Sequence, residues 1–178
     1  FVFFEVLLIA SYGLLLHGGG PKRTRAGLHY VVLNLIGSTL FLFAVGTLYG
    51  VLGTLNMADL TQNLATLDDD NVGIVRAAGL LLFVVFALKA ALAPLHLWLP
   101  GAYSYTSLPV AAMFAIMTKV GAYAILRVYT LMFGAGNGPT ADLLEPWLLP
   151  LALLTVAAGT VGLLASQRLA QQAAYLVV

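Results

Sequence analysis

Three charged residues stand inside long apolar runs of the sequence: Glu5, Lys89 and Lys119. A charge at the centre of a lipid bilayer costs at least about 2.5 kcal/mol, so ionisable side chains at that depth are typical of ion and proton pathways. A lysine whose carboxylate partner can move away can switch between holding and releasing a proton. The three residues therefore predict a proton relay, with a static ion pair that only orders the bundle as the alternative.

The three charges are predicted to lie at similar depths in the membrane. Lys89 precedes Pro100, where its apolar run ends, by 11 residues, or about 16 Å of helix. Lys119 follows Pro109, where its run begins, by 10 residues, or about 15 Å. Glu5 lies about 18 Å from the end of its run. Since the hydrocarbon core is about 30 Å thick, we expect Glu5 to pair with Lys89, and Lys119 to lie further along the same row.

A proline and a histidine follow Lys89 closely. Pro94 lacks an N–H and clashes with the carbonyl four residues earlier, so the helix is predicted to break there and to free the carbonyl of Ala90. Broken helices at mid-membrane are where transporters place ion sites, and an ordinary proline kink is the other interpretation. His96 lies on the predicted proton access path, which needs a titratable group; a hydrogen-bonded structural histidine is its alternative.

The composition indicates that lipid is the solvent for most of this chain. Of its 178 residues, 61% are hydrophobic and 8% are charged, whereas a soluble domain has roughly 25% charged residues. Cysteine is absent and the three histidines are scattered, so we expect no metal and no cofactor. The net charge of +1, without a basic cluster, argues against nucleic-acid binding.

The apolar runs divide the chain into five spanning helices and the start of a sixth, since a span needs roughly 20 residues. A lone strand in lipid leaves its backbone groups unpaired, so we expect an all-α integral membrane bundle with one helix broken at Pro94. We expect one transmembrane domain over residues 1–178, an internal piece of a longer protein or a truncated product. Trp98 and Trp147 are interpreted as interfacial anchors. The expected spans are residues 1–16, 30–55, 77–99, 109–133, 147–166 and, in part, 173–178.

The charges of the loops predict an orientation in the membrane. Residues 17–27 and 167–172 contain basic side chains, whereas residues 58–75 and 134–146 contain most of the acidic ones. By the positive-inside rule the two basic loops are cytoplasmic and the two acidic loops external. The sequence thus predicts a multi-pass protein of the plasma membrane.

Residues 86–103, which read FALKAALAPLHLWLPGAY, resemble the helix-and-break motif of the proton-antiporter family. That family includes the antiporter-like subunits of respiratory complex I and the two large subunits of Mrp-type cation/proton antiporters. Residues 109–127 resemble its next helix, and residues 3–6 resemble its carboxylate-bearing helix. Residues 101–103 and 117–121 are most similar to the D-type subunit of Mrp antiporters. One departure concerns the Asp-Leu-Lys-Arg-like run of many members, of which only the positive charge of Arg168 is kept here.

The resemblance implies a proton-translocating subunit of a multisubunit Na+/H+ antiporter, which is a secondary transporter and not an enzyme. Glu5 and Lys89 would be its ion pair, Lys119 its central relay, and His96 would lie on the connecting path. The implied partners are other membrane subunits, the lipid bilayer, protons and Na+. Two alternatives are an antiporter-like subunit of a complex I-type NADH dehydrogenase, and a structural membrane subunit with static buried ion pairs.

Overall fold

The computed structural model describes residues 2–134 and 138–178, and every element in this part of the chain is a helix. The side chains of residues 2, 4 and 5 lie outside the described part. The all-α prediction is therefore confirmed for the described residues. In chain order the elements, of which η1 and η2 are short 3-10 helices, are α1 (Val2–Leu16), α2 (Pro21–Leu52), α3 (Met57–Ala65), α4 (Asp69–Ala90), η1 (Leu95–Leu97), α5 (Trp98–Tyr105), α6 (Leu108–Met132), η2 (Gly138–Thr140), α7 (Glu145–Ala165) and α8 (Leu169–Val177).

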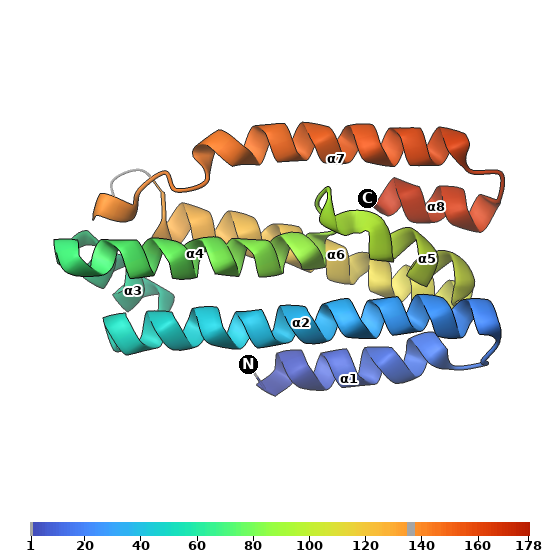
Figure 1. The fold of residues 1–178 in the computed structure, drawn as a ribbon, viewed down its shortest axis with the longest axis horizontal. Helices are drawn as coiled ribbons and strands as arrows, with labels where there is room; N and C mark the ends of the chain where they lie inside the picture. Colours follow the sequence, from blue (N-terminus) through green and yellow to red (C-terminus); the bar gives the residue numbers. More distant parts are fainter. Residues whose placement is uncertain (1, 135–137) are drawn as a thin grey trace.

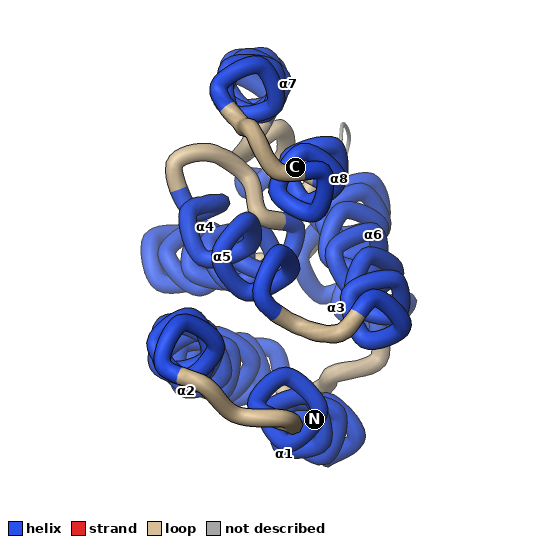
Figure 2. Tube along the Cα trace, turned by 90° about the vertical axis from the view of Figure 1, so that its right-hand side faces the viewer, coloured by secondary structure: helices blue, strands red, loops and turns tan. Residues whose placement is uncertain are grey.

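The long helices run side by side along the long axis of the molecule, as Figure 1 shows. Viewed along that axis, α1 and α2 lie at one side of the bundle and α7 at the other, with α4, α5 and α6 between them (Figure 2). The short helix α8 packs against α5 and α7. Helix α4 therefore lies at the centre, where it contacts both α2 and α6.

Local sequence sets where the long helices begin and end. A proline stands in the first turn of α2, α6 and α7, where its missing N–H costs no helical hydrogen bond. Helix α2 ends at Gly53, whose φ of 71° lets its N–H bond back to the carbonyl of Tyr49. Helix α3 begins at Asn56, whose side chain accepts a hydrogen bond from the N–H of Ala58 at 3.0 Å.

In the described part of the chain, four helical segments are long and apolar enough to cross a membrane: Pro21–Leu52, Asp69–Tyr105, Leu108–Met132 and Gly138–Ala165. They overlap the four inner spans predicted from the sequence, with different bounds. The described apolar part of α1 (Val6–Leu16) and α8, at 9 residues, are shorter than a span. Many apolar side chains on these helices are exposed, such as Leu149, which is 68% exposed, as lipid-facing surfaces require.

The structure differs from the sequence prediction around the third span. Helix α4 begins at Asp69, so Asp69 and Asp70 lie in its first turn and not in a loop, where negative charge favours the helix dipole. The predicted loop of residues 58–75 also contains α3, a short helix that packs against α6. Helix α4 ends at Ala90 and not at residue 99, with Ala91 in the left-handed conformation at φ 56°.

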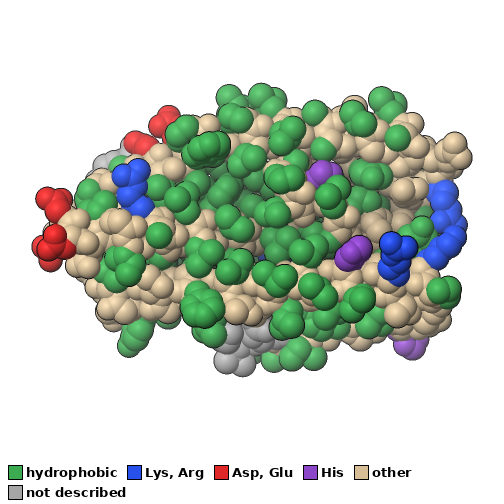
Figure 3. All heavy atoms as spheres, viewed as in Figure 1, with side chains coloured by type: hydrophobic (Ala, Val, Ile, Leu, Met, Phe, Trp, Pro, Cys, Tyr) green, Lys and Arg blue, Asp and Glu red, His purple; other side chains and the backbone are tan. Residues whose placement is uncertain are grey.

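Charged side chains separate toward the two ends of the bundle. In the face shown in Figure 3, the acidic side chains gather at one end and most of the lysines and arginines at the other. Apolar side chains cover most of the surface between them. This distribution matches a bundle whose middle lies in lipid and whose ends lie in water or among lipid headgroups.

Candidate functional site

The C-terminal end of α4 carries Lys89, which is half-buried in the centre of the bundle. Its ammonium donates a hydrogen bond to Oδ1 of Asn34, in the middle of α2. Asn34 is only 2% exposed. The structure thus joins a membrane lysine to a buried amide 55 positions away in the chain, a partner that the sequence interpretation missed. The side-chain amide of Asn34 inside the second span was the available signal.

The orientation of the Asn34 side chain is set from both sides. Its Nδ2 donates to the carbonyl oxygen of Tyr30 at 2.7 Å, so its Oδ1 is the atom left to accept from Lys89. The Tyr30 ring stacks on Phe114 with ring centroids 5.9 Å apart. The Tyr30 hydroxyl shares a 2.8 Å hydrogen bond with Ser11 of α1. Asn34 is therefore held in place by a packed aromatic residue that ties α1, α2 and α6 together.

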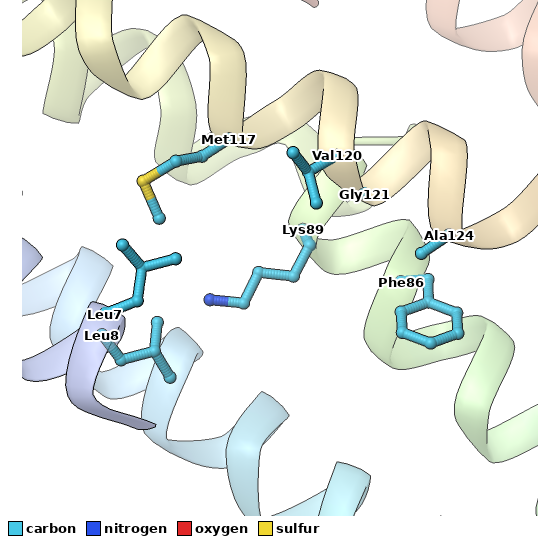
Figure 4. Close-up of a pocket in the computed structure, with 8 residues that line it drawn as sticks. All are labelled: Leu7, Leu8, Phe86, Lys89, Met117, Val120, Gly121 and Ala124. Carbon is cyan, nitrogen blue, oxygen red and sulfur yellow. The ribbon is translucent and has the colours of Figure 1, made fainter. Parts of the chain in front are cut away.

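A cavity of about 180 Å³ lies beside Lys89, between α1, α4 and α6. Figure 4 shows the lysine reaching across it toward Leu7 and Leu8 of α1. Cavities with apolar walls stay dry because water inside them finds too few hydrogen-bond partners. Among the described residues that line this cavity, Lys89 has the side chain that can form a strong hydrogen bond with a water molecule. The lining residues are Leu7, Leu8, Phe86, Lys89, Met117, Val120, Gly121 and Ala124.

Helix α6 touches the end of α4 at Gly121. A Cβ atom at this position would lie 2.6 Å from the backbone nitrogen of Ala90 and 2.9 Å from the carbonyl carbon of Lys89. Lys119 precedes Gly121 by two residues, about 3 Å along the helix axis. The two lysines therefore lie at adjoining levels of the bundle. The similar depths of the two lysines in the membrane stay a prediction.

Lys119 lies on the other side of this helix crossing from Lys89. It is exposed in the described structure, and its ammonium donates to the carbonyl oxygen of Val177 at 3.2 Å. It lines a groove of about 350 Å³ whose walls come from the end of α4 and from α6, α7 and α8. Thr118 and Thr155 are its other polar side chains. The structure therefore places the two lysines in two separate hollows.

The other two predicted relay residues are Glu5 and His96, and the structure says less about their partners. Glu5 belongs to α1, but its side chain lies outside the described residues, so the structure leaves its pairing with Lys89 a prediction. His96 lies in η1 and is half-buried. Its Nδ1 is buried with no hydrogen-bond partner in the described part of the chain, although most buried polar atoms have one. No hydrogen bond joins His96 to either lysine within that part.

Two side chains hold the segment between α4 and α5. The indole Nε1 of Trp98 donates to the carbonyl of Leu88 at 3.1 Å, which also accepts from the N–H of Ala91 at the end of α4. The Oγ1 of Thr155, on α7, accepts from the backbone N–H of Ala93 at 2.9 Å. Polar backbone at membrane depth needs such partners. The sequence interpretation assigned neither contact.

The two tryptophans have different surroundings. Trp98 is 6% exposed and packs against Tyr30 and Tyr103, so its interpretation as an interfacial anchor was wrong. Trp147 is 60% exposed near the start of α7, as an anchor would be. The described residues also contain no group of three His, Cys, Asp or Glu side chains that could hold a metal ion.

The chain matches known membrane proteins along almost its whole length. It is 48% identical over 178 residues to a probable K(+)/H(+) antiporter subunit, of the D type, from Rhizobium meliloti (strain 1021), covering 100% of this chain and 33% of that protein. It is 45% identical over 166 residues to the D-type Na(+)/H(+) antiporter subunit of Bacillus subtilis (strain 168), covering 93% of this chain and 32% of that protein. The chain thus spans about a third of the length of these relatives.

A solved structure shares the arrangement of helices. The Mrp complex from Dietzia sp. DQ12-45-1b superposes with a TM-score of 0.83 at 32% identity, over 99% of this chain and 32% of that one. Residues 1–176 match the family described as NADH:quinone oxidoreductase/Mrp antiporter, TM. With its apolar spans and this match, the chain belongs to the NADH:quinone oxidoreductase/Mrp antiporter transmembrane family.

Proposed function

We propose that the chain forms the proton-conducting part of a D-type subunit in a multisubunit monovalent cation/proton antiporter of the plasma membrane. Protons pass along a row of Glu5, Lys89 and Lys119, with His96 on the connecting path. The observation that carries this proposal is the crossing at Gly121, where two membrane lysines lie at adjoining levels on either side of one backbone contact. A proton leaving one lysine therefore has a second titratable amine at the adjoining level of the bundle.

The partners of the two lysines support an exchange of protons. Each ammonium donates to an uncharged oxygen: Lys89 to Oδ1 of Asn34, and Lys119 to the carbonyl oxygen of Val177. A neutral amine still has N–H groups to donate, so either lysine can keep this partner after it releases a proton. On α1, Glu5 precedes Leu8, which lines the Lys89 cavity, by one helical turn. That register supports a Glu5–Lys89 pair.

We further propose the membrane arrangement that this function needs. The chain forms one transmembrane domain, in which α1 and α8 are parts of two further spans and the break between α4 and α5 contains Pro94. The basic loops 17–27 and 167–172 face the cytoplasm and the acidic segments 58–75 and 134–146 face outward. The end of α4 at Ala90 supports the break, and the separated charges of Figure 3 support the orientation under the positive-inside rule.

The exchanged cation is proposed to be Na+, and the partners are the other membrane subunits of the complex. The relatives' names differ on this point, since one is a K(+)/H(+) and one a Na(+)/H(+) antiporter subunit. The second candidate function is a proton-pumping subunit of a complex I-type enzyme, which the family description includes. Identities of 48% and 45% to D-type antiporter subunits favour the first. A gene neighbourhood of antiporter genes, as opposed to a respiratory operon, separates the two.

The experiment uses the full-length subunit assembled in its complex and reconstituted in vesicles. A proton gradient is imposed, and a trapped pH-sensitive dye records whether added Na+ or K+ dissipates it. We expect a cation-dependent loss of the gradient, and the Glu5→Gln variant should shift the pH profile of that exchange, since its lysine partner loses a counter-charge. If neither Na+ nor K+ dissipates the proton gradient, the antiporter assignment is contradicted. A profile unchanged by Glu5→Gln would contradict the proposed pair.

Asn34→Leu should slow the same exchange about tenfold or more. The leucine has a similar size but cannot accept the hydrogen bond of Lys89, and a bond to a charged group contributes about 1.5–3 kcal/mol. Thr39→Val is the matched control on α2, since among the described residues the Thr39 hydroxyl bonds only to the carbonyl of Leu35 in its own helix. Rates are measured by the dye assay on equal amounts of assembled complex. An exchange rate in Asn34→Leu equal to that of the wild type would show that the Asn34 amide does not position Lys89.

A further inference from the structure

A second polar hollow lies at the basic end of the bundle, away from both lysine sites. It is a groove of about 360 Å³ between the start of α2 and the end of α5. Three basic side chains of α2 line it: Lys22, Arg25 and His29. We propose that this groove binds the phosphate group of an anionic phospholipid.

The three basic side chains are available to a ligand. All three are exposed, and none has a hydrogen bond or ion pair to another described residue. The nearby arginines are engaged differently. Arg23 donates from Nε to the carbonyl of Tyr105 at 2.7 Å, and the guanidinium of Arg168 lies 5.9 Å from the centre of the Tyr105 ring. The fold therefore uses Arg23 and Arg168 to hold α5, and leaves the groove's own cations uncommitted.

The backbone at the start of α2 adds to the attraction for an anion. Its N-cap is Gly20, which has no side chain to accept the first free N–H groups, and Pro21 follows in the first turn. The free N–H groups and the helix dipole favour negative charge at this end. Lys22 and Arg25 lie within the same first two turns. Side chains and backbone thus present positive potential to one small volume.

The length of α2 places the groove at the level of lipid headgroups. Its 32 residues span about 48 Å, at about 1.5 Å per residue. The hydrocarbon core takes up about 30 Å of that, which leaves about six residues at each end if the excess is shared equally. Lys22 and Arg25 then lie in the headgroup layer, and His29 lies at its inner edge. A soluble anion could bind a basic groove at any height on the surface, whereas the phosphate of a lipid requires a groove at the level of the headgroups.

The surface below the groove suits an acyl chain. Lys22, Arg25 and His29 are spaced at three and four residues, so they share one face of α2. The same spacing continues to Val32 and Ile36, which are 46% and 50% exposed. One helix face therefore carries cations at headgroup depth followed by exposed apolar side chains at hydrocarbon depth. A phospholipid, with its phosphate above and its chains below, matches this order.

The test reconstitutes the full-length complex in phosphatidylcholine vesicles with a trace of photoactivatable phosphatidylglycerol. Crosslinked peptides from residues 21–36 are quantified by mass spectrometry. In Lys22→Gln/Arg25→Gln the yield should fall about 25-fold, because each Lys or Arg near an anionic lipid contributes about fivefold in affinity. The matched control is Arg76→Gln/Arg127→Gln, which removes the same charge from residues outside the groove and should leave the yield unchanged.

Three results would overturn the proposal. The first is an equal loss of yield in both double variants, which would reflect overall charge and not a site. The second is an equal yield with photoactivatable phosphatidylcholine, which would mean that the net negative charge of the lipid is not recognised. The third is displacement of the probe by inorganic phosphate at constant ionic strength, which would assign the groove to free phosphate. Normal assembly of each variant, checked by size-exclusion chromatography, shows that a lost crosslink reflects lost binding.

Discussion

Lys119→Ala, in the full-length assembled complex, is expected to abolish cation-dependent proton exchange while the complex still assembles. The ammonium of Lys119 lines an open groove and touches the described chain through one hydrogen bond to a backbone carbonyl. Its removal should therefore cost little stability, about 1 kcal/mol or less. Transport is measured by the vesicle dye assay and assembly by size-exclusion chromatography.

Lys119→Arg separates a relay from a structural charge. Arginine keeps the positive charge and the donors but does not release its proton, so exchange should remain absent although every electrostatic contact is retained. Arg127→Ala is the matched control on α6, since Arg127 is exposed and bonds to Tyr123 of its own helix. Normal exchange by Lys119→Arg would rule out proton transfer through Lys119. Failed assembly of Lys119→Ala would favour the structural subunit instead.

Gly121→Ala should destabilise the subunit by about 1–3 kcal/mol, the usual cost of adding a methyl group to a packed contact. The new Cβ would lie 2.6 Å from the backbone nitrogen of Ala90, and backbone atoms cannot rotate away as a flexible side chain can. Helix α6 must therefore move away from the end of α4. Since that contact sets the two lysines at adjoining levels, exchange should fall together with stability.

Gly46→Ala is the control for this prediction. Gly46 lies within α2, and a Cβ there would meet no atom within 4 Å. The change should be neutral or stabilising, because alanine favours a helix over glycine by up to about 1 kcal/mol. Thermal unfolding of the purified complex in detergent measures both variants. Equal melting temperatures for the two would show that the α4–α6 contact tolerates a side chain.

Much of the fold follows from local properties of the sequence. A chain with apolar runs of span length can pair its backbone groups in lipid only by forming helices, and four apolar helical segments in the described residues overlap the predicted inner spans. Prolines and Gly53 mark helix ends through their own backbone preferences. The similar levels of Lys89 and Lys119 also follow from counting residues, because the helical rise is constant. The exact end of α4 does not, since Ala90 closes the helix before the proline does.

The surroundings of the candidate site depend on contacts between distant segments. Asn34 and Lys89 are separated by 55 positions, and no local pattern pairs them. Trp98 is of a residue type that is common at membrane interfaces, yet its indole donates a hydrogen bond to a backbone carbonyl at the end of α4. The exposure of Lys119 depends on how α6, α7 and α8 pack around its groove. The sequence alone determined that this is a helical membrane protein with lysines inside two of its apolar runs, because hydropathy is a local property. Only the tertiary structure decided which atoms those lysines meet, because helix packing sets their neighbours.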